Sequence, residues 1–288
     1  MDYLIHLAIL VGIYSILAIS LNLVVGFTGL LSITQAAFYG LGAYTTAIIL
    51  TTTGLNFFVS MLIGILITAV VSLSVGFVLS KFKGDYYALG SFGFNVIVFS
   101  IFLNWQDLTR GPLGIPGITR PSAFGFTFSE NIYYLILVVA FAGIIYGLSQ
   151  YITKSSFGRV LQAIREDDKA LKVFGYNTLL FKLVIFVIGA CFASVAGSLY
   201  ASYITYVDPS SFTLTESVFI LSIIILGGLA NNKGAICGAA FLILLPEILR
   251  FVGFPTDVAA QLRQAVYGLI LILLMMYRPQ GLVGKYRI

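Results

Sequence analysis

The chain alternates between long apolar runs and short polar connections. A helix that crosses a bilayer needs about 20 apolar residues. Runs of roughly that kind are 3–25, 35–52, 56–80, 86–103, 132–152, 179–203, 217–229, 235–252 and 258–277. The run 217–229 is short, so its ends are imprecise or it is a broken helix. The pattern predicts about 8–10 transmembrane helices in an all-α polytopic membrane protein, with residues 1–288 forming a single transmembrane domain.

Composition indicates the same fold class. Hydrophobic residues make up 59% of the chain, charged residues make up 9%, and the mean hydropathy is +1.03. A soluble domain carries about 25% charged residues. A chain of this composition cannot hide its apolar surface inside itself, so membrane lipid must cover the remainder.

Two glycine clusters interrupt the apolar pattern. Gly26 and Gly29 lie in the first half of the chain, Gly227 and Gly228 lie in the second, and each cluster precedes a helix rich in small residues. Transporters built from internal repeats have interrupted helices at matching positions of their halves. A broken helix beside a permeation pathway and plain helix packing both explain the first cluster.

Other small and polar residues also fall within the apolar runs. Gly143-xxx-Gly147 and Gly234-xxx-Gly238 place small residues on one helix face, which predicts close helix packing. Uncharged polar side chains at membrane depth are tolerated where they line a cavity or are buried in protein. We therefore take three such residues as candidates for lining a pathway: Asn22, Gln35 and Asn95.

Basic residues are distributed unevenly over the predicted connections. If the connection at 81–85 is cytoplasmic, twelve of the 16 Lys and Arg residues lie inside and four lie outside. Loops on the cytoplasmic side are enriched in basic residues. The count places the N-terminus outside and the C-terminus inside, unless 26–34 crosses or re-enters the membrane, which would move the N-terminus inside.

This bias also accounts for the net charge of +5. The sequence has no basic stripe with interleaved aromatic residues, so a nucleic-acid partner is not expected. The connection at about 104–131 falls on the outside and is rich in Gly and Pro, so turns are expected there. It is either a docking surface for an extracytoplasmic partner or a plain connecting loop.

Motifs for nucleotide binding and hydrolysis are absent from the sequence. It contains no GxxxxGK[ST], no HExxH and no GxSxG, so the chain is not expected to bind ATP or a metal, or to be an enzyme. Glu216 and Glu247 are the acidic residues within or beside the late runs, near predicted helix ends, and Glu247 can pair with Arg250. Ion-coupled carriers place acids in mid-membrane, so this pattern argues against an ion-coupled secondary carrier.

One segment, about 153–177, concentrates the charge, with eight charged residues between positions 154 and 172. Ser155 and Ser156 can cap a helix start, Gly175 suits its end, and Asn177 can cap the next run. Apolar residues recur at helical spacing and predict a single stripe: Val160, Ala163, Ile164, Ala170, Leu171 and Phe174. The charged segment is therefore one amphipathic helix or two that meet near Asp167.

Two surfaces could receive such a helix. A helix lying on lipid is usually basic without acids, whereas a protein partner can accept an amphipathic helix in a groove. The acidic triplet Glu166, Asp167 and Asp168 favours the protein partner.

The charged segment resembles the cytoplasmic coupling loop of ABC-importer permeases, which inserts into a cleft on the ATPase subunit. More narrowly, the chain resembles the branched-chain amino acid permease family of the LivM type, more than the LivH type. The stretches that carry this resemblance are spread over nearly the whole chain: 21–38, 40–44, 84–88, 111–117, 158–166, 197–200 and 234–247.

The resemblance implies an ABC-importer permease in a bacterial or archaeal cell (inner) membrane. Its partners would be a sister permease in a heterodimer, two ATP-binding subunits inside and a solute-binding protein outside that delivers leucine, isoleucine or valine. ATP would be bound by the partner subunits. Six residues would carry the coupling contacts: Gly158, Arg159, Ala163, Arg165, Glu166 and Gly175. Asp167 and Asp168 depart from the family pattern after Glu166.

Three alternatives remain beside this expectation. Related permeases handle urea, short amides or sugars. An ion-coupled secondary carrier would work without ATP or partners, and a membrane scaffold would bind partners without passing solute. Nothing in the sequence identifies the substrate.

Overall fold

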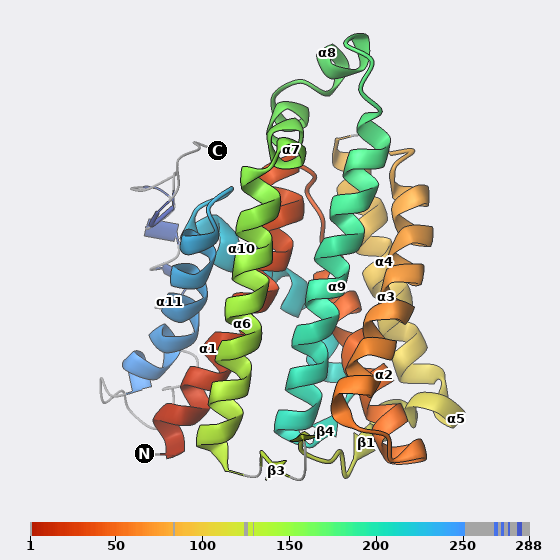
Figure 1. Ribbon diagram of the computed structural model, residues 1–288, viewed down its shortest axis with the longest axis vertical. Coiled ribbons are helices and arrows are strands. Elements are labelled where there is room, and N and C mark those ends of the chain that lie inside the picture. Colours follow the sequence, from red (N-terminus) through yellow and green to blue (C-terminus); the bar gives the residue numbers. More distant parts are fainter. Residues whose placement is uncertain are drawn as a thin grey trace.

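The computed structural model describes residues 2–82, 84–123, 126–128, 130–250, 268–269, 272–273, 276 and 281–283. Long, roughly parallel helices form a single bundle, with short helices and strands at its two ends (Figure 1). In chain order the elements are α1 (Asp2–Leu21), the π-helix η1 (Asn22–Gly26), α2 (Gln35–Thr53), α3 (Phe57–Leu79), α4 (Asp85–Asn104), α5 (Gln106–Thr109), the 3-10 helix η2 (Gly111–Leu113), β1 (Ile115–Pro116), β2 (Ser122–Ala123), β3 (Phe126–Thr127), α6 (Asn131–Lys154), α7 (Ser156–Glu166), α8 (Asp168–Val173), α9 (Thr178–Ile204), β4 (Tyr206–Val207), the 3-10 helix η3 (Pro209–Phe212), α10 (Leu214–Gly227) and α11 (Asn232–Arg250).

The all-α, polytopic fold class is confirmed. Five helices among the described residues are long and apolar enough to cross a membrane, namely α1 together with η1, and α3, α4, α6 and α9. The pair α10 and α11 makes a sixth if it is one broken span, bent by 119°. The described part thus accounts for five or six of the 8–10 predicted spans, and the predicted run 258–277 lies almost entirely outside it.

The predicted run 35–52 corresponds to α2, which has too many polar residues to be among those spans. It is nevertheless mostly buried, because it packs against α3 and α9. Gly42 of α2 and Gly197 of α9 lie directly against the backbone of the partner helix, at Ser194 and Tyr39 respectively. The absence of side chains at these two positions sets the spacing of α2 and α9.

Among the described residues, one of the two predicted glycine pairs packs against another helix. On α11, Gly234 and Gly238 lie against the backbone of α10 at Gly227 and Ile223, as predicted. On α6, a side chain added at Gly143 or Gly147 would meet no described atom within 4 Å, so close packing at this pair stays a prediction. Both residues lie on the outer surface of α6.

Both glycine clusters interrupt helices, as the sequence indicates. After α1 the backbone widens into η1, and residues 29–34 are non-helical before α2 begins. The second interruption separates α10 from α11 and contains two left-handed or unusual residues, Gly228 with φ 114° and Ala230 with φ 58°. A residue with such a φ cannot continue a right-handed helix.

The two ends of the bundle differ in character. The N-terminus and the connection 104–131 lie at one end, and α7 and α8 project from the other (Figure 1). Residues 282 and 283 bond to the carbonyls of Leu226 and Gly227, next to the second helix break. The N-terminus therefore lies opposite the charged segment, as the distribution of basic residues predicts when α7 and α8 face the cytoplasm.

The connection 104–131 is mostly turns, with one short helix, α5, and the 3-10 turn η2. Two short antiparallel pairs fasten it: Ile115 pairs with Val207, and Ser122 pairs with Thr127. The Tyr134 hydroxyl at the start of α6 donates to the Leu199 carbonyl of α9 at 2.5 Å. The end of the bundle that carries the N-terminus is thus stabilised by backbone pairing and by one buried tyrosine.

Candidate functional site

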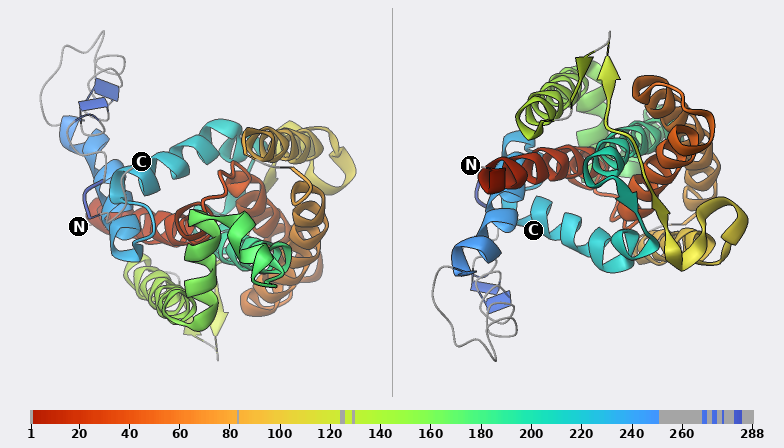
Figure 2. Two further views of the ribbon diagram at one scale, coloured as in Figure 1. Left: turned by 90° about the horizontal axis from the view of Figure 1, so that it is seen from above. Right: turned by 90° about the horizontal axis from the view of Figure 1, so that it is seen from below.

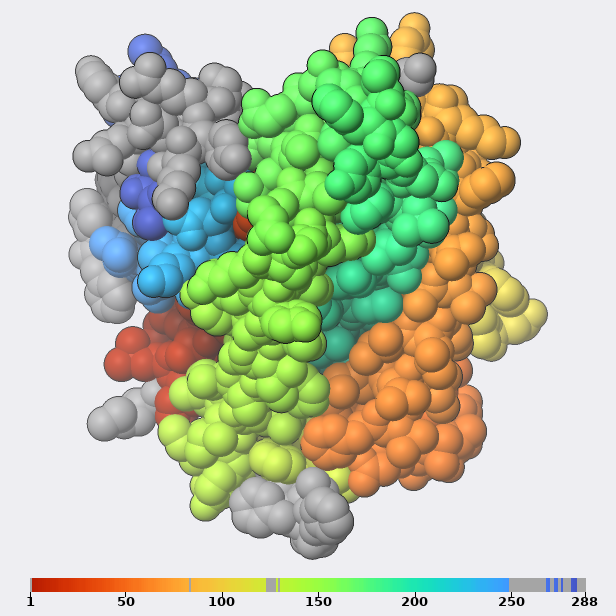
Figure 3. Space-filling view, turned by 45° about the horizontal axis from the view of Figure 1, so that its top comes forward, coloured from red at the N-terminus to blue at the C-terminus, as the bar shows by residue number. Residues whose placement is uncertain are grey.

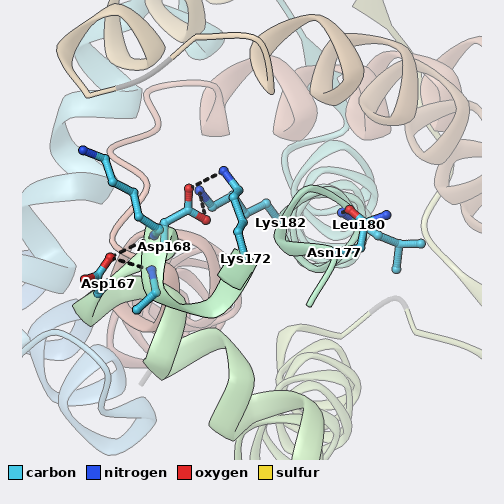
Figure 4. Close-up of polar contacts among 8 residues, drawn as sticks. Asp167, Asp168, Lys172, Asn177, Leu180 and Lys182 are labelled. Carbon is cyan, nitrogen blue, oxygen red and sulfur yellow. Dashed lines mark hydrogen bonds and ion pairs between the residues drawn. The ribbon is translucent and has the colours of Figure 1, made fainter. Parts of the chain in front are cut away.

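The charged segment forms two short helices rather than one. The Ser155 hydroxyl accepts from the Gly158 N–H at 3.3 Å and caps α7. At the other end of α7 the chain becomes extended at Asp167, whose carboxylate accepts from the N–H groups of Lys169 (2.8 Å) and Ala170 (3.1 Å) and caps α8 (Figure 4). Of the two predicted alternatives, one helix or two that meet near Asp167, the structure has the second, and the Asp167 carboxylate caps α8.

The apolar face of α7 packs against the bundle. Leu161 and Ile164 are 0% and 3% exposed and form a cluster with Leu23, Phe27 and Ile185. The prediction of one apolar stripe running from Val160 to Phe174 is therefore wrong, because the chain turns at Asp167. The buried face of α7 is available neither to lipid nor to a partner's groove.

α8 has the opposite arrangement. Val173 and Phe174 at its end are 87% and 78% exposed, the most exposed apolar side chains of the charged segment. The helix α8, whose end they form, projects together with α7 at the top of the molecule (Figure 3). Gly175 follows with φ 84°, which ends the helix and turns the chain back toward α9.

The six predicted coupling residues fall into two groups. Gly158 and Arg165 face the bundle: a side chain at Gly158 would collide with the carbonyls of Ile152 and Thr153, so glycine lets α7 cross the end of α6. Arg159, Glu166 and Gly175 are exposed, and Ala163 is half-buried. Arg159 donates to the Ser156 hydroxyl at 2.8 Å. Their role in coupling stays a prediction.

Arg165 connects α7 to the first helix break. Its guanidinium donates to the Gly26 carbonyl at the end of η1. Its aliphatic part lies next to Gly29, where an added side chain would come 3.1 Å from Cγ of Arg165. These contacts join α7 directly to the end of η1.

The first break is in turn connected to the second. The Asn22 amide accepts from the Ala230 N–H at 3.0 Å and donates to Asn232 at 3.3 Å. Asn232 donates to the Ser149 hydroxyl of α6 at 2.7 Å. Asn22 is fully buried. One network of polar contacts thus joins α7, both helix breaks and α6.

The other two pathway candidates also have partners inside the chain. Gln35 donates to the Ser20 hydroxyl. Asn95 donates to the Ile33 carbonyl at 2.8 Å and to the Ser217 hydroxyl at 2.5 Å. The side chains of Gln35 and Asn95 are 3% and 0% exposed. In this conformation the three candidates fix the broken segments in place, and a role in lining the pathway stays a prediction.

Asn232 and Ser217, which bond to Asn22 and Asn95 respectively, were not predicted from the sequence. Asn232 stands in a polar stretch at the start of α11 and Ser217 in an apolar run, so neither had a periodic signal. The only available signal was their position, directly after the second glycine cluster and at the start of the short run 217–229.

Of the two acidic residues singled out in the sequence, the structure identifies the partner of one. Glu216 lies in the first turn of α10, near a helix end as predicted, and its carboxylate accepts from the Tyr14 hydroxyl at 2.6 Å. Tyr14 is the central residue of the span Asp2–Gly26, so the expectation that no acid lies in mid-membrane is wrong for Glu216. Glu247 lies on α11 and has a side-chain interaction of its own. Its predicted partner, the Arg250 side chain, lies outside the described residues.

Asp168 fastens α8 to the beginning of α9. Its carboxylate lies 2.8 Å from the Lys172 ammonium and 3.1 Å from that of Lys182 (Figure 4). Partial burial of Asp168 raises the pKa of its carboxyl group, but hydrogen bonds from Lys172, Thr178 and Lys182 outweigh this effect and lower the pKa from 3.8 to about 2. The carboxylate is therefore charged throughout the physiological range.

Substituting Asp168 with asparagine is expected to loosen α8 from α9. A carboxyl group with a lowered pKa stabilises the fold above its ordinary pKa of 3.8 and loses that contribution as the pH falls through about 2. In the wild type, amide exchange over 168–174, corrected for its intrinsic pH dependence, should accelerate only below about pH 4. In Asp168→Asn it should be fast at neutral pH. Glu166→Gln is the matched control, and equal exchange in all three proteins would show that the ion pairs do not hold α8.

Comparisons with known proteins identify the family of the chain. The family model described as "Branched-chain amino acid transport system / permease component" matches residues 3–275. The chain is 33% identical to the high-affinity branched-chain amino acid transport system permease protein LivM of Escherichia coli and 32% identical to that of Salmonella typhimurium, over 98% of this chain and 70% of each relative. It is 26% identical to the LivH permease of Escherichia coli, over 94% of this chain and 91% of that protein.

No solved structure matches the chain. The higher identity to LivM than to LivH of Escherichia coli agrees with the resemblance found in the sequence. With a family match over nearly the whole chain and several membrane-spanning helices, this is a multi-pass membrane protein that belongs to the branched-chain amino acid transport permease family.

Proposed function

We propose that this chain is the transmembrane permease subunit of an ATP-driven importer for leucine, isoleucine and valine. The observation that carries the proposal is the architecture of the charged segment, in which α7 is fixed to the bundle and α8 exposes Val173 and Phe174 away from it. The substrate class comes from the printed names of the relatives, which are branched-chain amino acid permeases.

The ATP-binding subunits would dock on α8. Adjacent exposed apolar side chains rimmed by polar residues are typical of a protein interaction site, and the charges around Val173 and Phe174 are of both signs: Glu166, Lys169 and Lys172. Mixed charge suits a protein surface better than an anionic lipid surface. Because the sequence lacks a phosphate loop, ATP would be bound and hydrolysed by those subunits, and this chain would need no cofactor.

Two further partners complete the proposal. A sister permease would share the pathway in a heterodimer, as the match to both LivM and LivH relatives suggests. A solute-binding protein would approach the opposite end of the bundle, where the connection 104–131 lies beside the N-terminus.

The decisive experiment reconstitutes the chain with its sister permease, ATPase subunits and binding protein in liposomes. Uptake of labelled leucine that requires ATP supports the proposal, and competition by excess urea would shift the substrate class to short amides. Uptake by the chain alone under an ion gradient would instead establish a secondary carrier. Assembly without any solute flux would establish a scaffold.

The substitution Phe174→Asp is expected to weaken attachment of the ATPase subunits by about tenfold or more. Apolar anchors at the centre of an interface commonly contribute about 2 kcal/mol or more. Recovery of the ATPase subunits on the purified permease measures the effect. Leu113→Asp is the matched control, because Leu113 is 80% exposed at the opposite end of the molecule. Equal recovery with both variants would place the docking surface elsewhere.

A further inference from the structure

Glu216 places a carboxylate at the middle of the membrane. Its partner, Tyr14, is the central residue of the 25-residue span Asp2–Gly26. At 1.5 Å per residue, Tyr14 lies about 18 Å from either end of that span, and the apolar part of a bilayer is about 30 Å thick. An ionisable side chain at this depth is costly to maintain, and such residues usually serve function.

A structural role in capping the helix does not account for Glu216. Thr213 and Glu216 have the spacing of a capping box, in which the glutamate bonds back to the start of its own helix. Here Thr213 makes no side-chain capping bond, and the carboxylate accepts from Tyr14 on another helix. Among the described residues, the ion pairs join Asp168 to Lys172 and Lys182, and Glu216 has no cationic partner.

The surroundings of Glu216 differ from the lipid-facing surface. α3 exposes eight large apolar residues along its length, whereas α10 exposes one, Val218, next to the exposed Thr215. Ser222 lies one turn further along the helix and is half-buried. In both views of Figure 2, α10 lies at the opposite edge of the bundle from α6. The outer face of α10 thus carries two hydroxyl side chains near Glu216 and fewer exposed apolar residues than α3.

Two aromatic rings lie next to the Glu216 carboxylate. The rings of Tyr14 and Phe219 meet edge to face, with centroids 5.6 Å apart, and both are half-buried. The neighbouring Ser217 is bonded to Asn95 and to the Ala36 N–H, which fixes the start of α10 against the start of α2. A fixed carboxylate beside aromatic rings matches the two features of a branched-chain amino acid, an ammonium group and an aliphatic side chain.

We propose that Glu216 binds the α-ammonium group of the amino acid as it passes along the outer face of α10, with the Tyr14 and Phe219 rings contacting the side chain. This site rests on the proposed function. A second permease, facing α10, would enclose the amino acid from the other side.

The test compares two variants in the reconstituted complex. Glutamine keeps the size of Glu216 and can still accept from Tyr14 but carries no charge, while Glu247→Gln makes the same chemical change on α11. Binding of an ammonium group predicts that Glu216→Gln lowers ATP-dependent leucine uptake by about tenfold or more, whereas Glu247→Gln leaves uptake close to that of the wild type. A merely structural carboxylate predicts that both variants transport leucine like the wild type, because glutamine at position 216 still accepts from Tyr14. Uptake by Glu216→Gln equal to the wild type would overturn the site.

A second measurement covers the case in which Glu216→Gln fails to fold. In an otherwise functional Thr215→Cys variant, modification by a cationic thiol reagent should be faster than by an anionic one and should slow during leucine transport. Equal rates with both reagents, unaffected by transport, would overturn the site. If the wild-type complex itself shows no ATP-dependent leucine uptake, the proposed function falls together with the site, so the two failures are distinguishable.

Discussion

Replacing Arg165 with alanine is expected to leave a complex that assembles and hydrolyses ATP but takes up leucine about tenfold more slowly or worse. Arg165 donates from α7 to the Gly26 carbonyl, where α1 ends. Without this contact, α7 keeps the apolar packing of Leu161 and Ile164 and so remains in place. A movement imposed on α7 by the ATPase subunits would no longer reach the first helix break.

Measuring ATP hydrolysis and leucine uptake on the same preparation tests this prediction. Arg165→Lys retains a donor and should recover part of the uptake. Arg159→Ala is the contrasting variant, because Arg159 is exposed and bonds only to the neighbouring Ser156 among its described contacts. It should weaken attachment of the ATPase subunits and leave the ratio of uptake to hydrolysis unchanged. A normal ratio in Arg165→Ala would show that movement passes to the bundle by another route.

The substitution Gly197→Val is expected to prevent folding of the bundle. A side chain at this position would collide with the Tyr39 carbonyl and come 2.8 Å from the Ala43 nitrogen. Because the obstacle is the backbone of α2, it cannot turn aside as a side chain would. The cost should therefore exceed the roughly 1–3 kcal/mol that overpacking of a core usually carries, and α2 should separate from α9.

The yield of monodisperse protein in detergent and the midpoint of thermal unfolding measure this effect. Gly143→Val on α6 makes the same chemical change where no described atom lies within 4 Å. That variant should purify and unfold like the wild type. Similar behaviour of the two variants would mean that the contact between α2 and α9 does not determine stability.

The sequence predicted local features of the fold well. Glycine clusters located both helix breaks, because residues with positive φ end a helix wherever they occur, as Gly228 does. The predicted caps at Ser155 and Asn177 are also present, because a serine or asparagine side chain bonds to the first N–H groups of the helix that follows it. The distribution of Lys and Arg placed the N-terminus opposite the charged segment. These features depend on one residue or on its immediate neighbours.

Features that depend on contacts between distant helices could not be predicted. The stripe from Val160 to Phe174 did not indicate that α7 would be buried and the end of α8 exposed, because both faces are apolar. The glycine pairs at 143 and 234 have the same spacing, yet within the described part of the chain only the second faces another helix. Glu216 looked like a residue at a helix end, and its depth became apparent only from its contact with Tyr14.

The same holds for the candidate site. The family resemblance identified Arg165, but its bond to Gly26 joins positions 139 residues apart. Polarity alone selected Asn22, Gln35 and Asn95, and it could not distinguish a side chain that faces a channel from one that bonds within the chain. All three are bonded within the chain in this structure.

The contacts of Asn22 impose an order on biosynthesis. Its partners Ala230 and Asn232 follow it by 208 and 210 residues. At a synthesis rate of about 5–20 residues per second, they emerge from the ribosome roughly 10 to 40 s later. During that interval the Asn22 amide must be satisfied by water or by the insertion machinery. The first helix therefore cannot reach its final arrangement in the membrane until α11 has been inserted beside it.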